Sequence, residues 1–287
     1  MAIETVSIVG VGLIGGSFGL ALRAAGFTGR ILGVSSPRTI EAALARSAID
    51  KGLPLAKAVP QSDLIYLSQS IARILELLPQ VSELAPSGAL VTDAGSTKQQ
   101  IVEVARESFT GGALFLGGHP MAGKEQRGVE RAEADLFHDA TYVLTPHDDR
   151  LPSVPIIEEF VSWVREIGAR PVVFPAAEHD RIVGWTSHLP QLLATALASS
   201  IAENVSDADS LRVAGPGLRD MTRLAESPYD VWKDIFATNT ADIVGALDAY
   251  IDKLASLRNE LTGELTGAKV AEEFEAAQQL RRKLHSD

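Results

Sequence analysis

Short apolar runs alternate with longer amphipathic stretches over the first 175 residues, and this alternation constrains the fold more than any other feature of the chain. Runs of this kind, separated by segments with apolar side chains every third or fourth position, are typical of βαβ units and of a mostly parallel, doubly wound sheet. We therefore predict an α/β fold with strands at 5–11, 30–35, 63–68, 89–94, 114–119, 140–145 and 170–175. Helices are predicted at 16–26, 38–49, 70–84, 97–108 and 154–168.

The hexapeptide GVGLIG lies between the first predicted strand and the first predicted helix. In a dinucleotide-binding loop Gly10 would permit the tight turn, Gly12 the close approach of a pyrophosphate, and Gly15 the close packing of the helix. Leu13 and Ile14 complete the loop before a helix whose N-terminus, with its free N–H groups, favours an anion. The context predicts a Rossmann-type dinucleotide site that includes these five residues.

The pattern changes after Pro175, where strand signals disappear. Residues 179–204 and 227–261 carry apolar side chains at three- and four-residue spacing, and 271–287 form a last amphipathic segment. We predict an N-terminal dinucleotide-binding domain over residues 1–175 and an all-helical domain over residues 176–287.

Composition narrows the class of protein. The 37 acidic residues outnumber the 26 basic ones, for a net charge of −11, which disfavours a nucleic-acid-binding or anionic membrane surface. The chain has no cysteine, so disulfides and thiolate catalysis are excluded. No apolar run approaches the roughly 18 to 20 residues of a membrane span, no signal-peptide pattern is present, and no histidine–carboxylate cluster has metal-site spacing. We expect a cytoplasmic protein without a bound metal.

The end of the second strand bears on the choice of cofactor. An NAD-binding loop usually has an Asp or Glu there for the ribose hydroxyls, whereas this chain has Ser35, Ser36 and Arg38. Two hydroxyls and a guanidinium suit a 2′-phosphate, which a carboxylate would repel. We predict NADP as the cofactor, with NAD as a possible alternative. The two serines could instead only cap the next helix.

Two further loops follow neighbouring strands at the same edge of the sheet. TDAGSTK carries Asp93, Ser96 and Lys98, and GGHPMAGKE carries His119 and Glu125. A proline and two glycines beside the histidine predict a tight corner rather than a regular central strand. A histidine beside a bound dinucleotide suggests hydride transfer assisted by a general base.

The chain resembles the prephenate and arogenate dehydrogenases of tyrosine biosynthesis. The matching stretches are GVGLIGGS, DAGSTKQQI, GGHPMAGKEQRGVERAEADLF, HDRIVGWTSHLPQ and GLRDMTRLAESPYDVWKDI, in order as far as about residue 235. The resemblance implies a helical C-terminal domain that forms a homodimer. It also implies oxidation of a cyclohexadiene ring hydroxyl, transfer of hydride to the nicotinamide, and loss of carbon dioxide to give a phenol.

By the same resemblance, His119 accepts the proton of the ring hydroxyl and Ser96 helps to hold both groups. Arg223 pairs with a substrate carboxylate, and Trp232 and Glu125 line the pocket. His188, in the SHLP stretch, is a further substrate-binding candidate.

The chain departs from the family pattern at two places. Many relatives have a second histidine three residues after the one at position 188, where this chain has Gln191. Glutamine keeps the capacity to hydrogen-bond but carries no charge. Near the cofactor, the third strand ends in SQS from Ser68, where the family commonly has a small residue, a threonine and a proline. His179, beside Asp180 at a helix start, is expected to cap or support structure.

Other readings remain open. A β-hydroxyacid dehydrogenase shares this architecture, but it needs a lysine from the early helical region, and no lysine occurs between Lys124 and Lys233. A non-catalytic NADP-binding sensor would have no use for Ser96, His119 and Arg223 together. The motifs do not separate prephenate from arogenate, which differ in one side chain, and they do not address inhibition by tyrosine.

Overall fold

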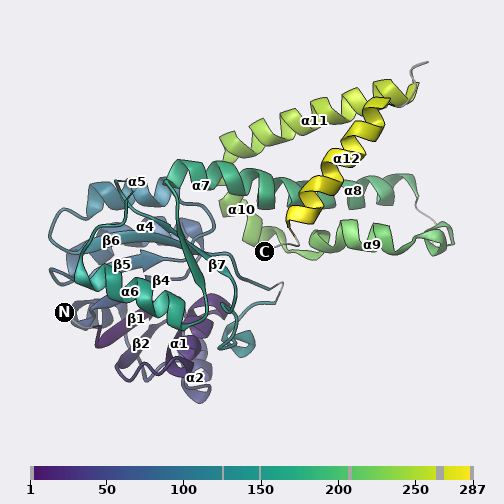
Figure 1. The fold of residues 1–287 in the computed structure, drawn as a ribbon. Coiled ribbons are helices and arrows are strands. Elements are labelled where there is room, and N and C mark those ends of the chain that lie inside the picture. The colour runs from purple at the N-terminus through teal and green to yellow at the C-terminus, as the bar shows by residue number, and fades with distance from the viewer. Residues whose placement is uncertain (1–2, 125, 149, 206–208, 263–267, 285–287) are drawn as a thin grey trace. The chain divides into compact units, whose positions relative to one another are not determined.

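The computed structural model describes residues 3–124, 126–148, 150–205, 209–262 and 268–284. The chain divides into two compact units, Met1–Thr240 and Ala241–Asp287. The first unit contains the sheet and most of the helices (Figure 1). The predicted domain division at residue 175 stays a prediction.

One eight-stranded sheet, in the order β3-β2-β1-β4-β5-β6-β7-β8, organises the first unit. Every neighbouring pair is parallel except β6 and β7, which are antiparallel. The mostly parallel, doubly wound sheet is thus confirmed, with β3 as a short addition. The strands are β1 (Thr5–Val9), β2 (Arg30–Val34), β3 (Lys51–Gly52), β4 (Leu64–Leu67), β5 (Leu90–Asp93), β6 (Leu114–Pro120), β7 (Thr141–Thr145) and β8 (Arg170–Val173).

Each helix predicted between the strands is present with bounds within a few residues, and the structure adds shorter helices that were not predicted. The helices between strands are α1 (Leu13–Ala24), α2 (Pro37–Ala45), α3 (Leu55–Ala58), η1 (Val59–Gln61), α4 (Ile71–Leu84), α5 (Gln99–Ser108), η2 (Val129–Arg131) and α6 (Pro155–Glu166). Those after the sheet are α7 (Ala176–Val183), the π-helical turn η3 (Gly184–His188), α8 (Leu189–Asn204), η4 (Ser210–Val213), α9 (Pro216–Thr222), η5 (Arg223–Glu226), α10 (Tyr229–Thr238), α11 (Thr240–Thr262) and α12 (Ala268–Lys283).

The sheet is covered on both faces because its strands send alternate side chains to opposite sides. Val6 and Ile8 of β1 join a core cluster that contains Phe18 of α1 and Phe160 of α6. A second core cluster, on the other face of the sheet, contains Val9 of β1 and apolar residues of α4 and α5. Figure 1 shows α6 crossing in front of the sheet.

The order of the strands reverses at β1, which lies between β2 and β4. The chain adds β2 and β3 on one side of β1 and then crosses over to add β4 and the following strands on its other side. In doubly wound folds a crevice opens at this point, beyond the carboxyl ends of the strands, and ligands bind there.

Strand β6 confirms the predicted strand at 114–119, whereas the expectation of a tight corner at His119 is wrong. Strand β6 pairs with β5 as far as Leu116 and then continues beside β7, with His119 opposite Val143 and Pro120 opposite Tyr142. The N–H of Met121 donates to the carbonyl of Thr141 at the start of β7. The nitrogen of Pro120, one residue earlier, therefore points to the opposite side of β6, where β5 has already ended at Asp93. The proline therefore costs no ladder hydrogen bond.

The second unit consists of the last part of the chain, α11 from residue 241 onward and α12. Lys253 Nζ and Glu273 Oε1 lie 2.6 Å apart and link the two helices. Ile251, Leu254 and Phe274 are exposed, the last to 66%. The two helices thus present apolar side chains that this unit does not bury by itself.

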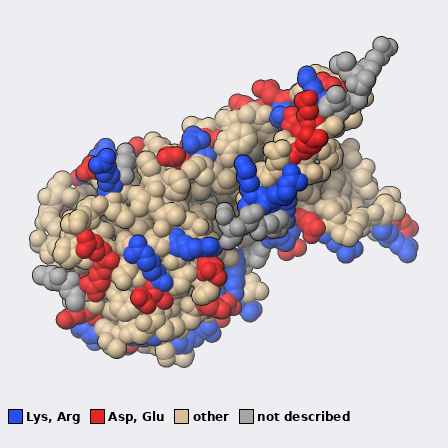
Figure 2. All heavy atoms as spheres, viewed as in Figure 1, with Lys and Arg blue, Asp and Glu red and all other residues tan. Residues whose placement is uncertain are grey.

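No helix in the described ranges is long and apolar enough to cross a membrane. On the face shown in Figure 2, acidic and basic side chains of the described residues intermingle over the sheet-containing unit. Over this unit, the described residues in the view form no continuous basic surface of the kind that binds nucleic acid.

Candidate active site at the carboxyl edge of the sheet

The glycine-rich loop has the geometry that a dinucleotide requires. Gly10 has φ +98°, and its carbonyl accepts the N–H of Gly12 at 2.9 Å. A Cβ on Gly12 would have no atom within 4 Å, whereas a Cβ on Gly15 would lie 2.4 Å from the oxygen of Gly10. Helix α1 begins at Leu13 without a side-chain cap. The open space before this bare helix N-terminus therefore fits a pyrophosphate.

Ser68 supports the loop from the end of β4. Its hydroxyl donates to the carbonyl of Gly10 at 2.8 Å, and its Oγ would lie 2.4 Å from a Cβ on Gly15. The serine therefore fixes the distance between β4 and the turn, which explains a small hydroxyl residue at this position.

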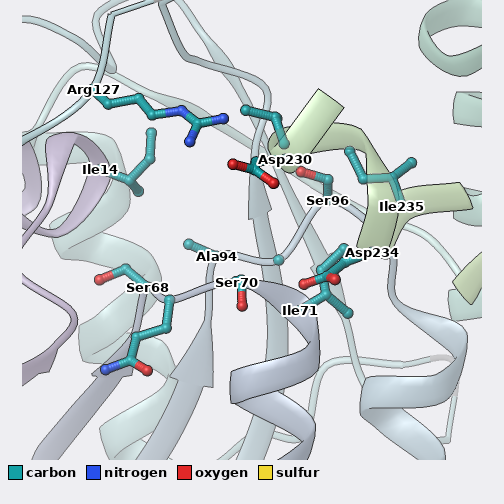
Figure 3. A pocket seen from close by; sticks show the side chains of 13 residues that line it. Ile14, Ser68, Ser70, Ile71, Ala94, Ser96, Arg127, Asp230, Asp234 and Ile235 are labelled. Carbon is teal, nitrogen blue, oxygen red and sulfur yellow. The ribbon is translucent and has the colours of Figure 1, made fainter. Parts of the chain in front are cut away.

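A cavity of about 280 Å³ opens beside this loop, between the ends of β4 and β5 and helix α10 (Figure 3). Three predicted residues line it: Ile14, Ser68 and Ser96. The cavity thus lies at the crevice expected from the strand order.

Charged residues that the sequence analysis did not single out also line the cavity. Arg127 reaches in from the loop after β6, and Figure 3 shows its guanidinium directed toward Asp230 of α10. Asp234 lies one turn further along the same helix and accepts the backbone N–H of Ala72 at 3.1 Å. The last contact holds α10 at the start of α4.

The residues after β2 are accessible. Ser35, Ser36 and Arg38 are all exposed. The Oγ of Ser36 accepts the N–H of Thr39 at 3.3 Å and so caps α2. The same Oγ lies 2.9 Å from Oγ1 of Thr39, so Ser36 is engaged by Thr39 through both its backbone and its side chain.

His119 is nearly buried near the end of β6, with 9% of its surface exposed. Its Nδ1 lies 2.8 Å from Nε2 of His179, whose Nδ1 lies 2.7 Å from Oδ1 of Asp180. Among the described residues, Nε2 of His119 has no hydrogen-bond partner. Burial, and then the nearby His179, Lys98 and His188, hold the pKa of His119 well below 6.5. This histidine is therefore neutral near pH 7 and can accept a proton.

A buried ion pair lies beneath the histidine. The ammonium of Lys98 contacts the carboxylate of Asp93 and donates to the carbonyl of Gly118 at 2.8 Å. The same carboxylate accepts the N–H of Gly95 at 2.8 Å and of Gly118 at 3.1 Å. Burial lowers the pKa of Lys98, and the adjacent aspartate opposes that shift. Together these contacts join the ends of β5 and β6.

Asp180 connects the carboxyl edge of the sheet to the helices that follow it. Its carboxylate accepts the backbone N–H of Lys98 at 2.7 Å and of Gln99 at 2.9 Å, at the start of α5. Its carbonyl accepts from Asn239 Nδ2 at 2.8 Å, and the same amide lies 3.2 Å from Nδ1 of His188. Burial lowers the pKa of His188 to about 4.

The predicted substrate-binding residues are dispersed in this single chain. His188 is buried and meets the ring of Trp232 edge-on, with 6.1 Å between the ring centroids. Gln191 is buried, and its amide donates to the carbonyl of Leu224 at 2.9 Å. Arg223 is exposed at the start of η5.

None of these residues is among the described residues that line the cavity, and His119 is not among them either. Glu125 lies outside the described residues.

The sequence indicated only a capping or supporting role for His179 beside Asp180, and it did not indicate their link to His119 or the contacts of Asn239. His179 and Asp180 share the buried face of α7 with Val183, so the spacing of a polar pair on an apolar face was the available signal. Asn239 follows α10 and carries no comparable signal in the sequence.

A doubly wound sheet, a glycine loop beneath a bare helix N-terminus and a buried neutral histidine at the same edge are features of a nicotinamide-dependent dehydrogenase. Two family models identify which one. Residues 18–173 match the nucleotide-binding domain of prephenate dehydrogenase, and residues 175–277 match its dimerisation domain. The chain belongs to the prephenate dehydrogenase family and is an NAD(P)-dependent oxidoreductase.

Individual relatives agree with this assignment. Prephenate dehydrogenase of Lactococcus lactis is 33% identical over 258 residues, which cover 88% of this chain and 70% of that protein. The structure of prephenate dehydrogenase from A. aeolicus with hydroxyphenyl propionate and NAD+ is 29% identical, covers 99% of both chains and has a TM-score of 0.88. Synechocystis arogenate dehydrogenase is also 29% identical, covers 98% of this chain and 99% of its own, and has a TM-score of 0.79.

Proposed function

We propose that this chain oxidises prephenate to 4-hydroxyphenylpyruvate, with hydride transfer to a nicotinamide cofactor and loss of carbon dioxide, in tyrosine biosynthesis. The family membership supports this reaction, and the relatives from L. lactis and A. aeolicus are named for it. Conversion of arogenate to tyrosine is the second candidate, because the similar Synechocystis enzyme is named an arogenate dehydrogenase.

The state of His119 carries the proposal. Its Nδ1 is engaged by His179 at 2.8 Å, which leaves Nε2 as the remaining nitrogen for a substrate. The low pKa keeps the ring neutral near pH 7, the form that accepts a proton. A buried ring held in one orientation also keeps the positional advantage that a mobile histidine would lose.

The chemistry follows from these positions. His119 accepts the hydrogen bond of the ring hydroxyl and takes its proton as the carbon–oxygen bond becomes a carbonyl. The bound nicotinamide supplies the hydride acceptor at the carbon that bears the hydroxyl. Ser96, at the cavity wall, helps to orient the hydroxyl. Arg223 holds the ring carboxylate until carbon dioxide leaves, and His188, Gln191, Trp232 and Glu125 complete the substrate-binding set.

For the cofactor we favour NADP over NAD. Ser35, Ser36 and Arg38 are exposed after β2, where the adenosine ribose would lie, and this short stretch contains no carboxylate. The structure of the A. aeolicus relative contains NAD+. A direct comparison of activity with NADP+ and with NAD+ therefore tests this preference.

We further propose a cytoplasmic homodimer that needs no metal ion. The family model assigns residues 175–277 to a dimerisation domain, and Ile251, Leu254 and Phe274 of the last helices are exposed. A second copy of the chain would bury such side chains. Light scattering coupled to size exclusion should give twice the mass of 30.5 kDa.

One set of measurements tests the reaction: kcat/KM for prephenate and for arogenate, each with NADP+ and with NAD+, together with identification of the products. We expect the highest value for prephenate with NADP+ and formation of 4-hydroxyphenylpyruvate and carbon dioxide. A higher value for arogenate would select the second candidate. Dinucleotide binding without turnover of either substrate would favour the sensor.

A further inference from the structure

We propose that His179 and Asp180 are positioning residues for His119: they select the tautomer that can act as a base and take over the positive charge that proton abstraction creates. The assignment rests on the proposed function of His119, and it gives a functional role to two residues that the sequence suggested were only structural.

The chain of contacts begins at a fixed carboxylate. Asp180 accepts two backbone N–H groups at the start of α5, from Lys98 at 2.7 Å and Gln99 at 2.9 Å. A carboxylate can only accept hydrogen bonds, and these two N–H donors supply two of them. Nδ1 of His179, 2.7 Å from Oδ1 of this carboxylate, must therefore carry a proton and donate it.

That donation determines the state of the next ring. A neutral histidine carries one ring proton, so the Nε2 of His179 is left as an acceptor. Nδ1 of His119, at 2.8 Å, must then be the donor. The Nε2 of His119 is left with its lone pair free, and this is the nitrogen that a substrate hydroxyl needs. Without His179, no contact in the described residues would select this tautomer.

The second role concerns charge. A proton on His119 would lie near the ammonium of Lys98 and near His188, with Asp93 as the partner of that ammonium. Asp180 is the carboxylate linked to His119 through hydrogen bonds, and it contacts His179 directly. Transfer of the Nδ1 proton of His119 to Nε2 of His179 would place the positive charge next to this carboxylate.

The atoms balance along this path. The substrate O–H bond breaks and an N–H bond forms at Nε2 of His119, while its Nδ1–H bond breaks and an N–H bond forms at Nε2 of His179. The electrons of the substrate C–H bond leave with the hydride to the nicotinamide. The proton that the substrate loses is thereby matched by the proton that His179 gains at Nε2, while its Nδ1 remains bonded to the carboxylate of Asp180.

A purely structural role is the alternative, because His179 and Asp180 are both buried and join α7 to α5 and β6. Two substitutions separate the possibilities. In His179→Asn the amide can reach Asp180 from the position of Nδ1 but no longer reaches His119. In His179→Gln the side-chain oxygen can still accept from His119, yet it cannot carry the charge. His138→Asn, which changes an exposed histidine, is the matched control.

The first test is kinetic, with prephenate or arogenate as substrate. We expect His179→Asn to lower kcat by roughly 10²- to 10⁴-fold, the range of a positioned acid–base group, with KM for substrate and cofactor within about threefold of wild type. His179→Gln should fall between this variant and wild type. In a His119→Asn background, His179→Asn should have no further effect, because it acts only through the missing ring.

The second test does not depend on turnover. Nitrogen-15 NMR of the histidine rings, assigned with His119→Asn, should show His119 as the Nδ1–H tautomer in the wild type and a loss of that preference in His179→Asn. An Nε2–H tautomer in the wild type would overturn the assignment. The assignment would also be overturned if His179→Asn lowered kcat by the same factor in the wild type and in the His119→Asn background. If neither substrate is turned over, the proposed function fails while the NMR result still decides the role of His179.

Discussion

The ammonium of Lys98 is buried against the carboxylate of Asp93, and both groups also bind the backbone of Gly118, one residue before His119. The pair therefore joins the ends of β5 and β6 directly beside His119, the candidate base. Removal of one partner would leave the other charge buried without compensation. Such losses are large because the interior cannot solvate the remaining ion.

Lys98→Met should accordingly lower the free energy of unfolding by about 3–5 kcal/mol, as measured by denaturant titration at neutral pH. Arg73→Met is the control, because Arg73 pairs with Glu76 at 2.7 Å on an exposed helix surface. That substitution should cost less than about 1 kcal/mol. Equal effects of the two substitutions would contradict a structural role for the buried pair.

His188 should make stability depend on pH. Its folded pKa is about 4, below the unfolded value of about 6.5, so the unfolded chain binds a proton that the folded chain does not. The stability present above pH 6.5 is therefore lost as the pH falls toward 4, by at most about 1.4 kcal/mol per pH unit. His188→Gln should flatten the curve of unfolding free energy between these values, whereas His138→Gln should leave its slope unchanged. An unaltered slope in both variants would refute the prediction.

Two glycines of the loop should respond differently to the same substitution. Gly12→Ala adds a methyl group to open space, so the fold should persist while the KM for the cofactor rises. Gly15→Ala drives a methyl group against the carbonyl of Gly10 and should destabilise the protein by about 1–3 kcal/mol. Thermal melting and cofactor titration of both variants provide the comparison. If Gly12→Ala bound the dinucleotide as tightly as wild type, the pyrophosphate would have to lie elsewhere.

Ser35→Asp tests the cofactor preference. The new carboxylate would repel a 2′-phosphate and could bind the free ribose hydroxyls, so the ratio of kcat/KM for NADP+ to that for NAD+ should fall at least about tenfold, equivalent to about 1.4 kcal/mol. Thr110→Asp adds the same charge on an exposed loop after α5 and should leave the ratio unchanged. A wild type that prefers NAD+ would show that the interpretation of this loop is wrong.

Arg223→Ala tests the proposed carboxylate site. A desolvated guanidinium–carboxylate pair is worth about 2.7 kcal/mol, so the KM for substrate should rise roughly 10²-fold with little change in cofactor affinity. Arg165→Ala, on the exposed side of α6, removes the same charge and should have no such effect. A normal KM for both prephenate and arogenate in the Arg223 variant would remove this residue from the site.

The sequence by itself determined the parts of this protein that depend on local patterns. The spacing of apolar residues predicted the strands that flank the glycine loop and the helices on both faces, because periodicity acts within one element. The motif GVGLIG marked the loop in which Gly10 makes the turn, Gly12 faces open space and Gly15 packs closely. The match of ordered motifs also indicated the family that the models identify.

Only the tertiary structure decided which side chains meet. His119 and His179 are 60 residues apart in the chain, and Lys98 and Asp180 are 82 apart. Nothing in the local pattern around either member specifies such a partner, because the contacts exist only when α7 packs against the start of α5. The place of Pro120 was decided in the same way, since its missing N–H is harmless only where β5 has already ended. Local propensity cannot register the end of a neighbouring strand, and for that reason the fold could be read from the sequence while the hydrogen bonds around the histidine could not.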